Sequence, residues 1–318
     1  PHCPCHAERS LIPDIFGLEK VMSSSLWGYP VSDPPESSAP LRVDLAGGWT
    51  DVHPYPTDFG GEVVNFAIKH RVTIRKLEEG ENSDLEFNFP VPRGSGLGTS
   101  SAMNVALAAL NSPSQLEKPE EIAEQAFVSE SQQNRCGRQD HWASAIGGFN
   151  HLLFIGDSVE RMPFEPMKSS LNWLKKHMVI SYSGISRNSG EIQESVWSRY
   201  SNGDERVVQG LHKIRSSARE MANGLQQDRR DLVVSSLRGV CEGVDMIDPT
   251  IHDPFRGVVM HLIESGSIVA WKALGAGGGG CSALLCSPNG KEYATQYIEN
   301  QGWKILDWDY DEQGVQVI

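Results

Sequence analysis

The sequence lacks any run of apolar residues long enough to cross a membrane, and its six cysteines form no double pair of the kind that binds zinc. Positive charge is also scarce: 28 lysine and arginine residues stand against 41 acidic residues, and the formal net charge is −13. That balance argues against nucleic acid or an anionic membrane surface as a partner. A small phosphorylated ligand stays compatible with it, because a local group of backbone N–H donors can oppose the overall field. A chain of 318 residues predicts one large domain or two closely packed ones.

The first residues lack the apolar core of a signal peptide, and the chain does not begin with methionine. We expect residues 1–21 to be an extension or leader, because Met22 offers a natural start. Two cysteines and two histidines leave metal binding in this segment open: His2, Cys3, Cys5 and His6. The other four cysteines are typical of reduced, buried residues in a cytoplasmic protein.

The most informative segment is rich in glycine and precedes a predicted helix. Gly94, Gly96 and Gly98 alternate with other residues, so the backbone can turn tightly and present N–H groups to an anion. No lysine follows as in a Walker A loop, and the spacing is not that of a Rossmann fold. The pattern indicates a phosphate-binding loop at a helix N-terminus, with a simple tight turn as the alternative. The expected buried stripe of the helix comprises Met103, Ala106, Leu107 and Leu110.

Periodicity elsewhere predicts strands first and helices later. Strands are expected at 41–46, 62–68, 71–77, 85–89, 151–155 and 178–182. Helices are expected from Pro119, over 138–146, and at 187–198, 204–224, 228–245 and 254–264. A strand near Trp271, a strand at 282–286, a helix at 290–299 and a strand at 303–309 complete the chain. This order predicts an α+β fold with two lobes.

Residues 42–51 form a first candidate site segment, in which a short strand ends at the pair Gly47-Gly48. Asp51 then lies at the edge of a tight loop, where a carboxylate suits two hydrogen bonds to neighbouring sugar hydroxyls. The alternative is that Arg42 and Asp51 pair with each other and hold the turn.

Two acidic residues form a second candidate group. Glu130 continues an apolar helical stripe, and a carboxylate on a buried face is costly unless it is paired or bound to metal. Glu130 is therefore a candidate ligand of Mg²⁺. Asp140 begins the next helix, and its alternative role is an N-terminal cap.

A third segment contains six residues, 275–280, of which five are glycine. It lies between two apolar strands, so we expect a close approach of backbone there rather than the alternative, a flexible turn.

These three segments, in this order, resemble the three motifs of the GHMP kinases, named for galactokinase, homoserine kinase, mevalonate kinase and phosphomevalonate kinase. The first segment is most similar to the branch that phosphorylates sugars. Residues 138–141, 147–150 and 182–187 are more similar to the kinases of D-glycero-D-manno-heptose 7-phosphate. Residues 42–51 are more similar to L-fucokinases.

The resemblance implies a two-lobed GHMP kinase fold with the active site between the lobes. The N-terminal lobe, over 22–165, would be like ribosomal protein S5 domain 2, and the C-terminal lobe, over 166–318, would be ferredoxin-like. ATP and Mg²⁺ are the implied cofactors. The implied ATP-phosphate ligands are Gly94, Ser95, Gly96, Leu97, Gly98, Thr99, Ser100 and Ser101.

The resemblance also implies roles for single residues. Ser100 and Glu130 would hold Mg²⁺, Asp140 would be the general base, and Arg42 would stabilise charge near the reacting hydroxyl. The implied substrate-binding residues are Asp51, Thr50, Gly48, His53, Arg138, Gly277 and Gly278. Arg138, Arg187 and His53 are candidates for binding a second phosphate on the sugar, or are surface residues. The sugar kinases usually have glutamine after the catalytic aspartate, whereas this chain has His141. This departure affects the sugar contact implied at that position and not the implied base, and a surface residue is the alternative for His141.

The predicted function is an ATP-dependent sugar 1-kinase. The preferred acceptor is D-glycero-D-manno-heptose 7-phosphate, and L-fucose is the alternative. The expected partners are ATP and a small sugar or sugar phosphate, with no nucleic acid and no membrane, and a homodimer is left open. The competing hypotheses are a sugar sensor without catalysis, a nucleotide-binding structural subunit, and a kinase of isoprenoid or amino-acid intermediates.

Overall fold

The computed structural model describes residues 35–77, 84–185 and 189–318. The predicted leader at 1–21, its candidate metal-binding residues and Arg187 lie outside the described residues. The described residues form one compact unit. The proposed lobe boundary near residue 165 stays a prediction.

The first sheet has the strand order β10-β1-β2-β4-β5, and β3 pairs with residues 73–76 at the C-terminal end of β2. Its strands are β1 (Glu36–Ala46), β2 (Gly61–Lys76), β3 (Leu85–Asn88), β4 (Phe149–Ile155), β5 (Ser158–Arg161) and β10 (Gln316–Val317). The expectation of two strands at 62–68 and 71–77 was wrong, because β2 runs unbroken along β1. A register shift opposite Pro40 and Leu41 accommodates Lys69 and His70, which interrupt the apolar pattern.

The second sheet has the order β7-β8-β6-β9, and all its pairs are antiparallel. Its strands are β6 (Met178–Tyr182), β7 (Ile268–Ala273), β8 (Cys281–Cys286) and β9 (Lys304–Leu306). Helices connect β6 to β7 and β8 to β9, whereas a glycine-rich loop connects β7 directly to β8. This alternation is that of a ferredoxin-like unit.

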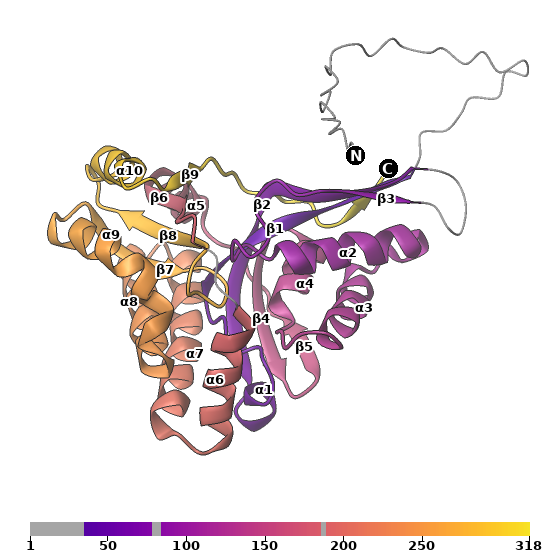
Figure 1. The fold of residues 1–318 in the computed structure, drawn as a ribbon, viewed down its shortest axis with the longest axis horizontal. Coiled ribbons are helices and arrows are strands. Elements are labelled where there is room, and N and C mark those ends of the chain that lie inside the picture. The colour runs from indigo at the N-terminus through magenta and orange to yellow at the C-terminus, as the bar shows by residue number, and fades with distance from the viewer. Residues whose placement is uncertain (1–34, 78–83, 186–188) are drawn as a thin grey trace, which may run out of the picture. The chain divides into compact units, whose positions relative to one another are not determined.

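The helices pack on both sheets. The longer ones are α2 (Thr99–Asn111), α3 (Pro119–Ser131), α4 (Gln139–Ile146), α5 (Lys168–His177), α6 (Ser189–Ser201), α7 (Glu205–Gln226), α8 (Arg230–Ile247), α9 (Asp253–Glu264) and α10 (Lys291–Asn300). Short turns of helix are α1 (Tyr55–Asp58), η1 (Pro113–Gln115) and η2 (Pro249–His252). Helices α2, α3 and α4 lie on one side of β1 and β2, and α7 lies on the other (Figure 1). Because α8 packs on both α7 and β7, the helical pair α7–α8 joins the two sheets.

The buried stripe of α2 differs from the expected one. Ala102, Val105, Ala106 and Ala109 are fully buried, whereas Met103 and Leu107, both expected in the stripe, are only partly buried. Small side chains on the inner face let α2 pack closely on the sheet, so the larger ones lie at its margin. The stripe of α3, which ends at the buried Glu130, was predicted correctly.

None of the helices in the described ranges combines the length and the apolar character that a bilayer crossing requires. Four cysteines belong to the described part of the chain and all are free thiols: Cys136, Cys241, Cys281 and Cys286.

Candidate active site

The predicted phosphate-binding loop is built on glycines in the left-handed region. Gly94, Gly96 and Gly98 have φ values of 78°, 81° and 75°, which only glycine adopts without strain. Gly98 directly precedes α2, so the loop leads into the helix N-terminus as expected. A Cβ atom on Gly96 would lie 2.3 Å from the carbonyl oxygen of Leu274, in the β7–β8 loop.

The second glycine-rich loop, residues 275–280, packs directly on the first. The Cys281 N–H donates to the Ser95 carbonyl at 2.7 Å, and a Cβ on Gly275 would lie 2.8 Å from the Cα of Gly96. The glycines therefore allow two backbones to meet, and the alternative of a flexible turn does not describe this loop.

Two adjoining pockets open where these loops meet β1 and α4. The larger encloses about 1450 Å³ including its open mouth, and the smaller about 460 Å³. Arg42 and Asp140 line both pockets. The predicted residues in the larger pocket also include Gly94, Gly96, Gly98, Thr99, Ser100, Ser101, Glu130 and Gly277. Gly48 and Asp51 line the smaller one.

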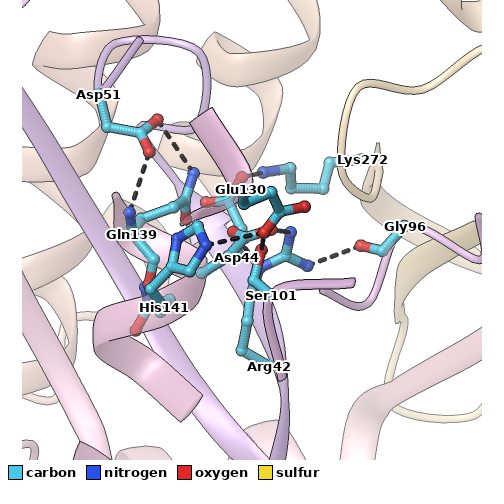
Figure 2. Close-up of polar contacts among 11 residues, drawn as sticks. Arg42, Asp44, Asp51, Gly96, Ser101, Glu130, Gln139, His141 and Lys272 are labelled. Carbon is cyan, nitrogen blue, oxygen red and sulfur yellow. Dashed lines mark hydrogen bonds and ion pairs between the residues drawn. The ribbon is translucent and has the colours of Figure 1, made fainter. Parts of the chain in front are cut away.

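Arg42 and Asp140 form a two-point ion pair at the junction of the pockets. Arg42 Nε donates to Asp140 Oδ1 at 2.7 Å, and Nη2 donates to Oδ2 at 2.6 Å. The remaining nitrogen, Nη1, donates to the Gly96 carbonyl at 2.6 Å (Figure 2). Asp140 therefore faces Arg42 rather than capping α4, and Arg42 pairs with Asp140 rather than with Asp51.

Glu130 lies in the larger pocket, where its carboxylate is held by two neighbours. Ser101 Oγ and His141 Nε2 lie 2.8 and 2.7 Å from its Oε2 (Figure 2). Burial alone would raise the pKa of Glu130, but the hydrogen bond and charge of His141 and the bonds from Ser100 and Ser101 outweigh burial and lower it to about 2. His141 is fully buried, so it is not a surface residue.

An ionised carboxylate beside a serine hydroxyl is a hard oxygen donor set, which suits Mg²⁺. Ser100 and Glu130 line the same pocket as the glycine-rich loop, so the residues present fit the predicted cation. Cys136 lies close by, and its sulfur is within 4.8 Å of donor atoms of Glu130 and His141.

Asp51 is buried in the wall of the smaller pocket. Its Oδ2 accepts from the backbone N–H of Gln139 at 3.0 Å, and its Oδ1 accepts from Gln139 Nε2 at 3.3 Å (Figure 2). Burial, followed by the charges of Asp140 and Asp44, raises the pKa of Asp51 to about 7. Because both oxygens are engaged by Gln139, the predicted sugar contact of Asp51 would have to share or replace these bonds.

Two residues that sequence reasoning missed form a buried ion pair beside the smaller pocket. Lys272 Nζ, from β7, donates to Asp44 Oδ2, from β1, at 2.5 Å (Figure 2). Their side chains are 5% and 3% exposed. A signal was present, because Arg42 and Asp44 are charged residues at alternate positions of an apolar strand.

Trp49, also missed, lines the pocket with a φ of 84°, which is strained for a residue other than glycine.

Some predicted residues line neither pocket and make internal contacts instead. Leu97 is fully buried, and its carbonyl accepts from the Arg42 N–H at 3.1 Å. Thr50 is also fully buried, and its hydroxyl donates to the Gly47 carbonyl at 2.7 Å. Gly278 donates its N–H to a carbonyl of η2, at Ile251.

Arg138 and His53 lie outside both pockets. The Arg138 guanidinium stacks 4.2 Å from the centre of the Phe127 ring and pairs with Glu124 at 3.1 Å. His53 Nε2 lies 3.3 Å from Arg138 Nη1. The structure therefore does not bring these two residues to the other site residues.

Comparison with known proteins agrees with this geometry. Residues 65–148 match the family described as GHMP kinases N terminal domain. The D-glycero-alpha-D-manno-heptose 7-phosphate kinase of Campylobacter jejuni is 24% identical, over 88% of this chain and 97% of its own length. The bifunctional fucokinase/GDP-fucose pyrophosphorylase of Arabidopsis thaliana is 22% identical over 85% of this chain, which spans only 32% of that enzyme. The mevalonate kinase of Pyrococcus horikoshii is 26% identical over 76% of this chain and 71% of its own length.

A solved structure of a D-glycero-D-manno-heptose 1-phosphate kinase from Bacteroides thetaiotaomicron superposes with a TM-score of 0.70 at 20% identity. The match covers 89% of this chain and 98% of that one. The chain therefore has the fold of the GHMP kinases, and residues 65–148 match their N-terminal domain, as the sequence motifs predicted. Its relatives are phosphotransferases that differ in the acceptor named for them.

Proposed function

We propose that the protein is an ATP-dependent sugar kinase that transfers the γ-phosphoryl group of ATP to the anomeric hydroxyl of its substrate. The observation that carries the proposal is the position of Asp140, which lies with Arg42 where the two pockets join. A group at this point can reach an acceptor in the smaller pocket and a phosphoryl group in the larger one.

In this proposal the glycine-rich loop and the N-terminus of α2 hold the ATP phosphates through backbone N–H groups. Ser100 and Glu130 would hold Mg²⁺, which would supply positive charge to offset that of the β- and γ-phosphates. Asp140 accepts the proton of the sugar hydroxyl while the hydroxyl oxygen bonds to the γ-phosphorus, and the bond from that phosphorus to the ADP oxygen breaks as ADP leaves. Arg42 holds the Asp140 carboxylate in place and stabilises negative charge near the transferred group.

D-glycero-D-manno-heptose 7-phosphate is the first candidate acceptor, because a relative named for it aligns over nearly the whole chain. L-fucose is the second candidate, supported by the relative with a fucokinase part. The low identity of both relatives leaves the choice between them to experiment.

The test is release of ADP with a panel of acceptors: D-glycero-D-manno-heptose with and without a 7-phosphate, L-fucose, D-mannose, D-galactose and mevalonate. Release that depends on a sugar, with a product phosphorylated at the anomeric carbon by NMR, is expected. Release with mevalonate alone would contradict the proposal. ATP binding without release for any acceptor would instead favour a sensor or a structural subunit.

A further inference from the structure

The smaller pocket contains buried acceptor oxygens that lack hydrogen-bond donors. Asp44 Oδ1, Gln139 Oε1 and Gln193 Oε1 are buried and have no hydrogen-bond partner among the described residues. All three side chains line this pocket, and they come from β1, α4 and α6. Each of these atoms is an acceptor, so the pocket lacks donors rather than acceptors.

An unpaired acceptor on a buried carboxylate is costly, and a ligand that donates to it recovers that cost. Sugar hydroxyls are such donors. A phosphate group at neutral pH presents mainly acceptor oxygens, so it cannot satisfy these three atoms.

Asp44 is held so that its free oxygen cannot turn away. Lys272 fixes Oδ2, and a Cβ on Gly48 would lie 2.1 Å from the same oxygen, so only glycine leaves it room. The contrast with Asp51 is direct, because Gln139 occupies both Asp51 oxygens.

The orientation of Gln139 is also set by its partner. Its Nε2 faces the Asp51 carboxylate at 3.3 Å, and an ionised Asp51 requires the donor nitrogen on that side. The amide oxygen is therefore left as the acceptor.

Charge in the pocket points the same way. Three carboxylates line it, Asp44, Asp51 and Asp140. Asp140 engages the guanidinium of Arg42, and Asp44 engages the Lys272 ammonium beside the pocket, so neither cation is free to pair with a phosphate group.

We propose that the smaller pocket binds an uncharged sugar ring, whose hydroxyls donate to Asp44 Oδ1, Gln139 Oε1 and Gln193 Oε1, and that Asp44 determines which sugar is accepted. This proposal rests on the proposed sugar kinase function and identifies the sugar ring as the part of the substrate that binds in this pocket. Any phosphate that the acceptor carries lies outside this pocket.

The test pairs protein variants with deoxy sugars. The probes are L-fucose, D-mannose and D-glycero-D-manno-heptose, with monodeoxy analogues that lack the hydroxyl at position 2, 3 or 4. The variants are Asp44→Asn and the double variant Asp44→Asn/Lys272→Met, which leaves no unpaired buried charge if the single variant folds poorly. Asp231→Asn is the matched control, because Asp231 is an exposed aspartate paired with Arg229.

In the wild-type protein we expect one deoxy position to lower kcat/KM by about 10- to 100-fold, the range for losing a hydrogen bond to a charged group. In the Asp44 variants KM for the intact sugar should rise by a similar factor while KM for ATP stays within about threefold. The deoxy penalty, meaning the factor by which kcat/KM falls from the intact sugar to the deoxy analogue, should then drop to about threefold or less at that position. Asp231→Asn should leave this factor unchanged.

Deoxy penalties that stay the same in folded Asp44 variants would overturn this inference and leave the kinase function standing. Wild-type protein that releases no ADP with any sugar would overturn the proposed function, and the inference with it.

Discussion

Arg42 and Asp140 are 98 residues apart in the chain, yet they meet through two hydrogen bonds of 2.7 and 2.6 Å. The arginine is buried, while the aspartate side chain keeps 23% of its surface exposed. The Arg42 guanidinium is thus fixed by its buried position, whereas the Asp140 carboxylate remains accessible from both pockets. This arrangement suits a base that must be held in place and still reach a substrate.

The first prediction concerns Asp140. Replacement Asp140→Asn keeps the shape and a hydrogen-bonding group but removes the base. We expect kcat to fall at least about 100-fold while KM for the sugar changes less than about threefold. Steady-state kinetics with the best acceptor measures both, with Asp231→Asn as the control for loss of one negative charge. A kcat within about threefold of wild type would contradict the assignment.

Replacement Arg42→Lys tests the geometry rather than the charge. Lysine keeps the positive charge but cannot make the two parallel bonds to Asp140 and the third bond to Gly96. We expect kcat/KM to fall about 10- to 100-fold, with a melting curve that stays cooperative. Kinetics equal to the wild type would show that charge alone suffices at this position.

Asp51 predicts a pH dependence of stability. Its pKa is about 7 in the folded protein, raised by burial and then by the charges of Asp140 and Asp44. A folded state that holds its proton more tightly than the unfolded state is stabilised at low pH, and this contribution is lost as pH rises from about 4 through about 7. Its full size is on the order of 4 kcal/mol.

Urea unfolding of wild type and Asp51→Asn between pH 5 and 8 checks this prediction. The variant cannot ionise, so its stability relative to wild type should increase as pH rises. A constant difference between the two proteins across this range would show that Asp51 does not titrate there.

Glu130 predicts a specific dependence on magnesium. Replacement Glu130→Gln removes the negative charge that we propose as a cation ligand. The Mg²⁺ concentration for half-maximal rate at fixed ATP should then rise at least about tenfold. A titration of rate against Mg²⁺ measures the shift, and superimposable curves for variant and wild type would remove Glu130 from the cation site.

Gly96 tests the contact between the two glycine-rich loops. Gly96→Ala would place a Cβ 2.3 Å from a backbone carbonyl, at a φ of 81°. Gly156 is a matched control, because its φ is also positive, at 58°, and no atom lies within 4 Å of its added Cβ. We expect KM for ATP to rise at least about tenfold in Gly96→Ala and to stay unchanged in Gly156→Ala. Equal effects would indicate backbone strain alone.

Much of the fold could be predicted because its signals are local. The stripe of α3, the strand β3 and the glycines before α2 follow from spacing and from backbone freedom within a few residues. The joined strand β2 could not be predicted from its own residues, because its continuity depends on pairing with β1. The rotation of the buried face of α2 likewise depends on the surfaces against which it packs.

The candidate site shows the same division. Arg42 and Glu130 are visible in the sequence, because charges that interrupt apolar patterns stand out, and Asp140 is visible as an acidic residue at a predicted helix start. Their partners are not visible. The packing of Arg138 on Phe127 takes it out of the pockets, and Gln139 occupies the oxygens of Asp51.

The sequence by itself determined the glycine loops, most of the helices and strands, and the resemblance to the GHMP kinases, since these depend on neighbouring residues and on motif order. Only the tertiary structure decided that Arg42 faces Asp140 and that Lys272 fixes Asp44. Such pairs form between residues 98 and 228 positions apart. Which charge neutralises which is therefore settled by how the sheets and helices pack, and no local pattern records it.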